Sequence, residues 1–162
     1  MERGKKYKEK VLVHRKQDDN CLILHSGGTT GTPKNILLTN GNVNSIMEQA
    51  KIIFPNITTG DKFLSVLPLF HCFGLVVCVH APLCLGATAI LVPQFDAGRF
   101  DKLITKYHPT VLPGVPTLFE ALTKNKYMDN VDLSYVKYVI SGGDSLSKTK
   151  NEEVNNFLKD HG

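Results

Sequence analysis

The amino-acid sequence predicts an α/β fold in which a mostly parallel sheet carries helices on both faces. Short apolar runs alternate along the chain with longer segments whose apolar residues recur at helical spacing. Most of the segments between these runs are long enough for a helical crossover, which two parallel strands require. Of the 162 residues, 42% are hydrophobic and 21% are charged, which is typical of a globular chain that forms a core without disulfides.

We expect a polar, basic lead-in over residues 1–20, followed by one domain over residues 21–162. The lead-in holds 7 Lys and Arg residues against 4 Asp and Glu residues, so most of the net charge of +4 belongs to it. Because the remaining body is almost neutral, the charge balance does not favour a nucleic-acid partner.

The apolar runs predict the strands of the sheet. Each run is too short for a helix and is bounded by Gly, Pro or polar residues, as expected of strands buried in a parallel sheet. The first run is therefore predicted as a buried strand, and a loop rich in Gly and Thr separates it from the second. The strands are expected at residues 21–24, 36–38, 62–67, 89–92, 110–112 and 136–140.

Helical spacing of apolar residues predicts the helices between these strands. From Val43 to Phe54 the apolar residues share one face, and Thr39 or Asn40 is the expected cap of this first helix. Pro116 is suited to open a later helix because its fixed φ fits the first turn. The other helices are expected at residues 71–85, 100–107 and 117–122, with a last one that carries Val154, Phe157 and Leu158.

The cysteines and the termini indicate a reducing compartment. Cys72, Cys78 and Cys84 recur within one apolar run at a spacing that turns them about 240° apart on a helix, so they cannot converge on a metal. With Cys21 they are expected to be buried, reduced thiols. The N-terminus lacks the apolar stretch of a secretion signal. We therefore expect a cytoplasmic protein without a transmembrane segment, while a peripheral membrane contact stays open.

The loop between the first two predicted strands has the composition of a phosphate-binding loop. Its glycines free the backbone so that successive N–H groups can face an anion, and its hydroxyl side chains add donors. It is not a Walker A loop, because the chain continues beyond Lys34 into a strand rather than a helix. An ordinary polar turn is the alternative. The candidate phosphate-binding residues are Ser26, Gly27, Gly28, Thr29, Thr30, Gly31 and Lys34.

Residues 26–34, Ser-Gly-Gly-Thr-Thr-Gly-Thr-Pro-Lys, resemble the phosphate loop of the adenylate-forming superfamily. That superfamily includes acyl-CoA synthetases, luciferases and peptide-synthetase adenylation domains. Gly27 and Asn35 depart from the most common form of the loop, and its Ser-Gly-Gly start resembles the variant of bacterial long-chain acyl-CoA synthetases. The resemblance spans residues 21–162 and implies part of the large N-terminal domain of such a synthetase.

Three further motifs follow in the order that the family has. Residues 68–74 resemble the family segment that borders the acyl pocket, and residues 114–119 resemble a second stretch beside that pocket. Residues 141–147 resemble the stretch whose backbone lies against the adenine. The resemblance thus implies an acyl pocket with Phe70, His71, Gly74, Gly114 and Val115, and an adenine side with Gly142, Gly143 and Asp144.

Two of these assignments have structural alternatives. His71 stands between apolar residues at the start of a predicted helix, where a core histidine with satisfied hydrogen bonds is common. Asp144 precedes the last predicted helix and could serve as its N-cap instead of contacting a ligand.

The resemblance implies that ATP activates a carboxylic acid as an acyl-adenylate and that the acyl group passes to coenzyme A, with Mg²⁺ as cofactor. A fatty acid is expected, because segments 68–80 and 111–119 are apolar and contain no acidic residue. The family's Mg²⁺-associated Glu, ribose-binding Asp and catalytic Lys have no counterpart in this sequence. We therefore expect a piece of a longer synthetase that holds no catalytic residue or metal ligand and is inactive alone.

Other functions share some of these features. An aryl-CoA ligase or a peptide-synthetase adenylation domain would carry the same phosphate loop, and a nucleotide-binding module without turnover would also need it. Residues 143–146, Gly-Asp-Ser-Leu, spell the signature of a lipase family in which Ser145 would be the nucleophile. We reject that interpretation, because Asp160 and His161 are adjacent and the Asp cannot orient the His as a base.

Overall fold

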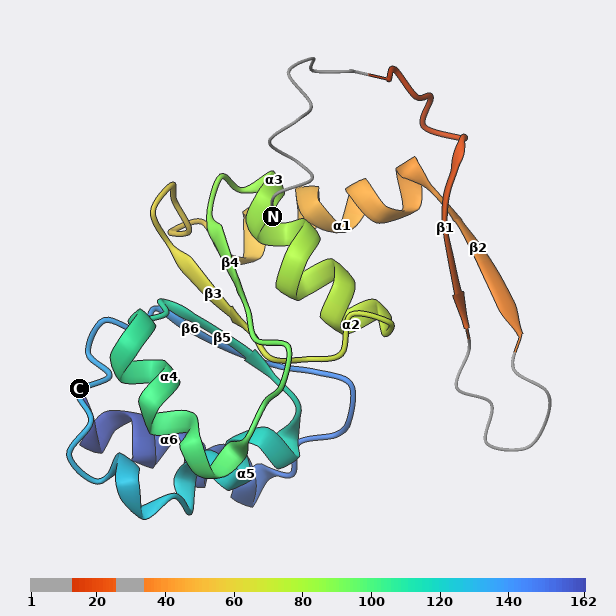
Figure 1. Ribbon diagram of the computed structural model, residues 1–162. Coiled ribbons are helices and arrows are strands. Elements are labelled where there is room, and N and C mark those ends of the chain that lie inside the picture. Colours follow the sequence, from red (N-terminus) through yellow and green to blue (C-terminus); the bar gives the residue numbers. More distant parts are fainter. Residues whose placement is uncertain (1–12, 26–33) are drawn as a thin grey trace. The chain divides into compact units, whose positions relative to one another are not determined.

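The structure is a computed structural model that describes residues 13–25 and 34–162 (Figure 1). The chain divides into two compact units, one ending at Ile46 and the other running from Met47 to Gly162. The second unit contains the parallel sheet and every candidate site residue outside the phosphate loop.

The first unit contains an antiparallel ribbon in which β1 (Asn20–His25) pairs with β2 (Asn35–Thr39). The prediction of a buried strand at residues 21–24 is wrong, because Ile23 on β1 is 60% exposed and Leu37 on β2 is 52% exposed. The connection between the two strands is too short for a crossover helix. They therefore form a hairpin instead of joining the parallel sheet.

Helix α1 (Asn40–Ile53) follows β2 directly. The hydroxyl oxygen of Thr39 accepts a hydrogen bond from the backbone N–H of Asn42 at 3.2 Å, and the Asn42 side chain accepts one from the Thr39 N–H at 3.0 Å. This reciprocal pair confirms Thr39 as the cap. On the predicted apolar face Met47 is buried, whereas Ile46 and Ile53 are exposed.

The second unit is built on four parallel strands in the order β4-β3-β5-β6. Phe63 on β3 lies opposite Ala89 on β4 and Val111 on β5. Each strand begins and ends within two residues of the predicted run, and β4, β5 and β6 are shifted at both ends. They are β3 (Lys62–Ser65), β4 (Thr88–Leu91), β5 (Val111–Gly114) and β6 (Tyr138–Ser141).

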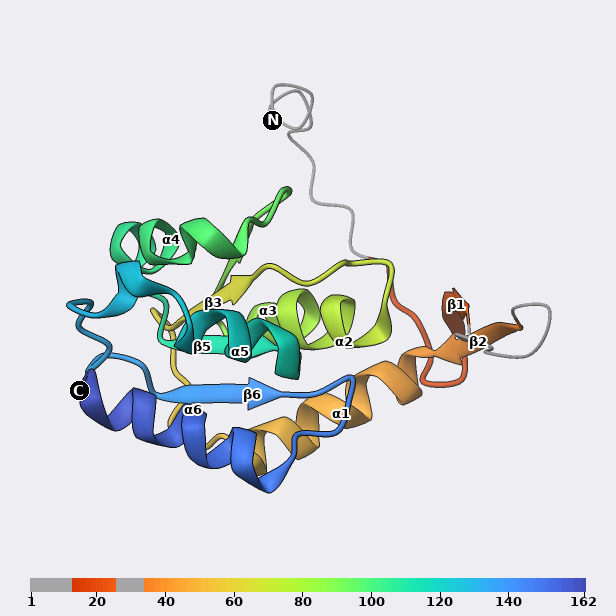
Figure 2. The same ribbon diagram turned by 90° about the horizontal axis from the view of Figure 1, so that it is seen from below.

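Helices cover both faces of this sheet, which confirms the predicted fold class (Figure 2). Leu64 and Leu112 pack into the larger core beneath α4, α5 and α6, while their neighbours Phe63 and Val111 enter a smaller core on the opposite face. The helices on the first face are α4 (Phe100–Tyr107), α5 (Pro116–Thr123) and α6 (Lys148–Asp160), with short 3₁₀ turns at Ala97–Arg99 and Lys126–Met128.

One continuous helical segment covers the other face, where the sequence predicts a helix over residues 71–85. It consists of α2 (Cys72–Leu75), a π-helical turn (Val76–His80) and α3 (Ala81–Cys84). Pro82 explains the turn, because it has no N–H to donate to the carbonyl of Cys78. The buried hydroxyl of Ser65 on β3 donates to that carbonyl instead, at 2.5 Å. The irregular turn thereby attaches the helix to the end of β3.

The expectation of four buried thiols holds only for Cys78. Burial raises the pKa of the Cys78 thiol to about 11. The thiols of Cys21, Cys72 and Cys84 are free but exposed. The apolar run around Cys72 and Cys84 does not bury them, because the helical segment turns only one face to the sheet.

Asp61, at the amino end of β3, should make stability fall at low pH. Its carboxylate is buried, accepts a hydrogen bond from the Thr58 N–H at 2.7 Å and pairs with Lys137 at 2.9 Å. Burial alone would raise the pKa of Asp61, but the hydrogen bonds from Thr58 and Lys137 outweigh it and hold that pKa below its usual value. The stabilisation is therefore complete above the unfolded-state pKa of about 3.9 and is lost as the pH falls through the lower folded-state pKa.

We expect Asp61→Asn to lower the free energy of unfolding at pH 7 by about 1–3 kcal/mol and to flatten its dependence on pH below 4. Urea unfolding followed by circular dichroism across this pH range measures both effects. Asp129→Asn, at an exposed position, is the control. An equal acid sensitivity in wild type and Asp61→Asn would contradict the prediction.

Candidate functional site

The candidate residues of the second unit gather where the parallel strands end. All four strands run in one direction, so the loops that follow them meet at the carboxyl edge of the sheet, where α/β sheets bind ligands. Along this edge the loops come in the order β4, β3, β5, β6. The predicted acyl-pocket segments follow β3 and β5, and the predicted adenine-side segment follows β6.

The structure brings the predicted adenine side and acyl side into direct contact. The N–H of Gly142 donates a hydrogen bond to the carbonyl of Gly114 at 3.1 Å. A Cβ added to Gly142 would lie 2.8 Å from the ring of Phe73, so only glycine lets this ring approach the backbone. Gly143 has a φ of +79°, and an added Cβ there would lie 3.3 Å from Val115. The glycines of this motif thus allow close packing between two loops.

Gly114 and Gly74 are also buried in contacts that leave no room for a side chain. An added Cβ on Gly114 would lie 2.6 Å from Leu118 and 2.7 Å from Phe119, both on α5. On Gly74 it would overlap the carbonyl oxygen of Pro68. Gly74 therefore fixes the start of α2 against the loop after β3.

Phe70 and His71 are exposed beside this packed region, so His71 is not a buried core histidine. Their rings lie 4.8 Å apart, and 76% of Phe70 is accessible to solvent. The backbone N–H of His71 donates to the carbonyl of Pro68 at 3.2 Å. The His71 side chain makes no capping bond to α2, which leaves its ring at the carboxyl edge.

Asp144 is exposed and does not cap the last helix. Its carboxylate accepts a hydrogen bond from the N–H of the next residue, Ser145, at 2.7 Å. The N-cap of α6 is Ser147, whose hydroxyl oxygen accepts from the Lys150 N–H at 3.3 Å. The capping alternative for Asp144 is wrong, because the helix begins three residues later than that alternative requires.

Most of the candidate phosphate loop lies outside the described residues. This applies to Ser26, Gly27, Gly28, Thr29, Thr30 and Gly31. Lys34 is described and is exposed immediately before β2. The chain does continue from Lys34 into a strand, as predicted.

A cavity of about 600 Å³ opens at the carboxyl ends of β3 and β4. The part of its wall that follows β4 contains none of the site residues predicted from the sequence. The signal was present, since Pro93 directly follows a predicted parallel strand. The cavity is lined by Ser65, Val66, Leu67, Pro68, Leu69, Phe70, Leu91, Val92, Pro93 and Phe95.

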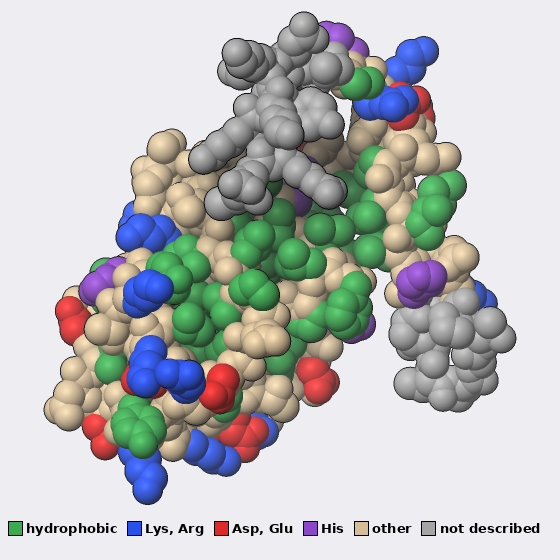
Figure 3. All heavy atoms as spheres, viewed as in Figure 1, with side chains coloured by type: hydrophobic (Ala, Val, Ile, Leu, Met, Phe, Trp, Pro, Cys, Tyr) green, Lys and Arg blue, Asp and Glu red, His purple; other side chains and the backbone are tan. Residues whose placement is uncertain are grey.

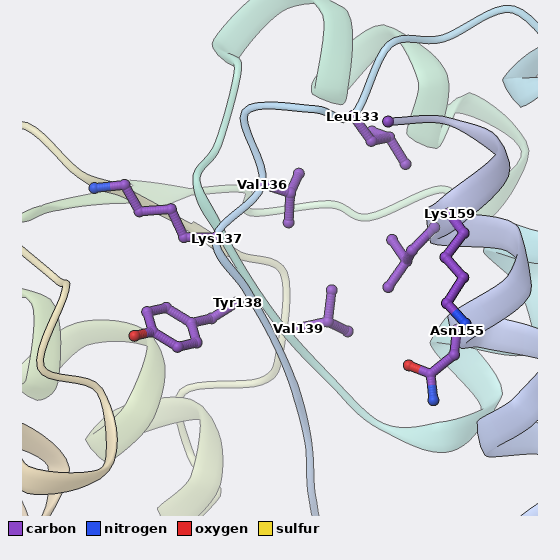
Figure 4. Close-up of a pocket in the computed structure, with 9 residues that line it drawn as sticks. Leu133, Val136, Lys137, Tyr138, Val139, Asn155 and Lys159 are labelled. Carbon is purple, nitrogen blue, oxygen red and sulfur yellow. The ribbon is translucent and has the colours of Figure 1, made fainter.

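A second cavity, of about 360 Å³, lies between the start of β6 and the second half of α6 (Figure 4). Val136 and Val139 point towards α6, whereas Lys137 and Tyr138 point to the other side of the strand. The ammonium of Lys137 is held by Asp61. None of the predicted site residues lines this cavity in the described part of the chain, so the carboxyl edge remains the candidate site.

Ion pairs hold α5 in place behind the carboxyl edge. The carboxylate of Glu120 lies 2.8 Å from the ammonium of Lys124 and 2.6 Å from that of Lys150 on α6. The hydrogen bonds from Lys124 and Lys150 lower the pKa of Glu120 to about 2. Glu120 therefore stays ionised. Its ion pair with Lys150 links α6 to α5, the helix whose first turn packs against Gly114.

Within the described residues, no three His, Cys, Asp or Glu side chains are grouped so that they could hold a metal ion. The described part of the carboxyl edge therefore contains closely packed glycine residues and an apolar cavity, but no ligand set for Mg²⁺. In the same part of the chain, no helix is both long and apolar enough to span a membrane.

Comparison with known proteins gives consistent matches over nearly the whole chain. A family model described as AMP-binding enzyme matches residues 2–161. A long-chain-fatty-acid–CoA ligase of Bacillus subtilis (strain 168) is 34% identical over 93% of this chain, and a 4-coumarate–CoA ligase 1 of Narcissus pseudonarcissus is 36% identical over 93%. The chain spans 28% and 27% of these two relatives.

The fold also matches solved structures. The crystal structure of ATP-bound MatB from Rhodopseudomonas palustris superposes with a TM-score of 0.78 and 27% sequence identity. The match covers 89% of this chain and 28% of that protein. The sequence and structure matches together extend over the segments that carry the predicted adenine side and acyl side.

Proposed function

The chain belongs to the AMP-binding enzyme family, and from this membership we propose that a longer protein containing it is an AMP-forming acyl-CoA synthetase. In the proposed reaction, ATP and a carboxylic acid give an acyl-adenylate and pyrophosphate, and the thiol of coenzyme A then displaces AMP. The contact between the predicted adenine-side and acyl-side loops, at Gly142 and Gly114, is the observation that carries the proposal. An acyl-adenylate joins those two groups covalently, so its binding site needs the two loops side by side.

The described residues have binding and orienting roles in this proposal. Gly142 and Gly143 let the backbone after β6 approach the adenine, and Gly114 and Val115 form the adjoining wall on the acid side. Asp144 stands at the exposed end of the adenine side. Lys34, with the phosphate loop before it, would stabilise charge on the transferring phosphate, and Mg²⁺ when bound would neutralise triphosphate charge.

A fatty acid is the proposed substrate, and an aromatic acid is the second candidate. The fatty-acid proposal is supported by the acid-free segments 68–80 and 111–119 and by the similarity to a long-chain-fatty-acid–CoA ligase. The similarity to a 4-coumarate–CoA ligase supports the alternative of an aryl-CoA ligase. An amino-acid substrate is less compatible, because its ammonium group would need a buried carboxylate partner.

A substrate panel tests this proposal. The longer protein is assayed for CoA-dependent AMP release with acetate, octanoate, palmitate, benzoate, 4-coumarate and amino acids. We expect activity with fatty acids that rises along the chain-length series, because each buried methylene contributes about 0.8 kcal/mol. A preference for 4-coumarate or benzoate would replace the fatty-acid proposal by the aryl-CoA alternative, and no AMP release with any acid would favour a nucleotide-binding module without turnover.

Lys34→Ala in the same longer protein should impair the use of ATP. Losing a charge-assisted contact to phosphate is expected to lower kcat/KM for ATP roughly ten- to a hundredfold. The melting temperature should stay nearly unchanged, because Lys34 is exposed. Lys16→Ala, at another exposed lysine of the first unit, is the control. Unaltered kinetics in Lys34→Ala would mean that the loop is an ordinary turn.

A further inference from the structure

We propose that Ser65 is a positioning residue, which orients the acyl-adenylate site without touching a substrate. Its hydroxyl holds the register of the helical segment over residues 72–84, and this register places the Phe73 ring against the loop after β6. Register here means the rotation of the segment about its own axis relative to the end of β3. This inference rests on the proposed function, because that function makes the loop after β6 a binding segment.

The hydroxyl of Ser65 replaces a hydrogen bond that the helical segment itself cannot make. In a regular α-helix the Cys78 carbonyl would accept from the N–H of residue 82, and Pro82 has none. The Ser65 hydroxyl donates to this carbonyl at 2.5 Å. Ser65 is 3% exposed and Cys78 is 0% exposed, so water at the surface does not reach the carbonyl. Removing the hydroxyl therefore leaves a buried acceptor without this donor.

Two more contacts join the helical segment to the chain that leaves β3. Burial raises the pKa of the Cys78 thiol, and a hydrogen bond with the Leu67 backbone partly opposes that rise, so the thiol lies against this backbone. At the start of the segment, an added Cβ on Gly74 would overlap the carbonyl oxygen of Pro68. The segment is thus anchored to residues 65–68 at two successive turns.

Apolar packing by itself does not determine this register. The helical segment is almost wholly apolar, and Figure 3 shows hydrophobic side chains gathered over the part of the second unit where it lies. The burial of apolar surface is not directional, so it does not select one rotation of such a helix. A hydrogen bond requires a defined distance and angle. The hydrogen bond from Ser65 therefore selects the rotation.

The register reaches the candidate site through Phe73, in the first turn of the segment. Its ring fills the space beside Gly142, where an added Cβ would lie 2.8 Å away. The Gly142 N–H in turn donates to the Gly114 carbonyl. A π turn and an α turn differ by one residue in hydrogen-bond register, which corresponds to a rotation of about 100°. A regular turn would therefore move the ring away from Gly142 and leave the loop after β6 without this support.

The first test measures the Phe73 contact in the 162-residue chain through the ring-current shift of the Gly142 amide. Phe73→Leu defines the position of this resonance without the ring. We expect Ser65→Ala to move the resonance towards that position, and Ser65→Thr, which keeps the hydroxyl, to leave it near wild type. Thr123→Val is the matched control, because the Thr123 hydroxyl also donates to a helix carbonyl, that of Glu120 at 3.2 Å, but lies on α5. An unmoved Gly142 resonance in Ser65→Ala overturns the proposal.

The double variant Ser65→Ala/Pro82→Ala separates positioning from the satisfaction of a buried carbonyl. Alanine at position 82 supplies an N–H, so the Cys78 carbonyl regains a donor and a regular α-turn can form. We expect the urea midpoint to recover relative to Ser65→Ala, while the Gly142 resonance stays displaced. This variant also serves if Ser65→Ala alone is poorly folded. A Gly142 resonance that returns to its wild-type position would reduce Ser65 to a donor for the carbonyl and overturn the proposal.

In the longer protein the same variants distinguish orientation from binding. The acid-dependent exchange of pyrophosphate into ATP is measured over a range of ATP concentrations. We expect Ser65→Ala to lower kcat about tenfold and to change KM for ATP less than about twofold, because a displaced segment misorients bound substrates. Ser65→Thr should recover kcat, and Thr123→Val should match wild type.

The outcomes also separate this inference from the proposed function. An undiminished kcat in Ser65→Ala overturns the positioning role and leaves the acyl-CoA synthetase proposal standing. A longer protein that exchanges no pyrophosphate with any acid overturns the proposed function, and the Gly142 resonance still decides whether Ser65 sets the register.

Discussion

Phe119→Ala is expected to lower the free energy of unfolding by about 3–5 kcal/mol. The Phe119 side chain is 1% exposed and belongs to the larger core, between α5 and the face of the sheet that carries Leu64 and Leu112. Its removal leaves a void that the surrounding strands and helices can close only in part. Urea unfolding of the 162-residue chain, followed by circular dichroism, measures the loss.

A control at the surface isolates the effect of burial. Tyr127 is 73% exposed, so Tyr127→Ala should change stability by less than about 0.5 kcal/mol. Phe119→Leu should recover much of the loss, because leucine refills most of the volume. Equal stability of Phe119→Ala and Tyr127→Ala would mean that the larger core is not packed as described.

The two central strands of the parallel sheet, β3 and β5, could be predicted because they are buried on both faces. Such strands appear in the sequence as short continuous apolar runs, as around Phe63 and Leu64 or Val111 and Leu112. The run containing Ile23 has the same composition but lies in an exposed hairpin. Composition shows that a run is apolar and does not show which element, if any, covers it. For β1, the sequence therefore predicted the position of the strand correctly but predicted its burial wrongly.

The glycines of the candidate site could be found from the sequence, but their physical reason could not. Gly142 is needed because the ring of Phe73 occupies the space of a side chain, and these two residues are far apart in the chain. The hydrogen bond from Ser65 to the Cys78 carbonyl depends in the same way on contacts between distant segments. So does the part of the cavity wall that the loop after β4 forms. Local patterns show that a loop follows β4, but they carry no information about which distant segments that loop packs against.

Gly74→Ala is expected to lower kcat/KM of the longer protein about a hundredfold. The new Cβ would overlap the carbonyl oxygen of Pro68, which is backbone and cannot rotate away. The loop after β3 must therefore move, and with it Phe70 and His71. A displacement of about 1 Å in a segment that positions a reacting group is enough for a loss of this size. Stability should fall as well, by about 1–3 kcal/mol, because the added methyl group overpacks a buried site.

Measuring activity and unfolding in the same preparation separates positioning from folding. Gly98→Ala is the matched control, since Gly98 is exposed and its added Cβ would lie 3.3 Å from the Asp96 carboxylate. It should leave both quantities unchanged. If positioning is what Gly74 provides, kcat/KM of Gly74→Ala stays low at temperatures where circular dichroism shows the protein fully folded. Activity that returns to the wild-type value under those conditions would assign Gly74 to stability alone and remove the β3 loop from the set of segments that orient the acid.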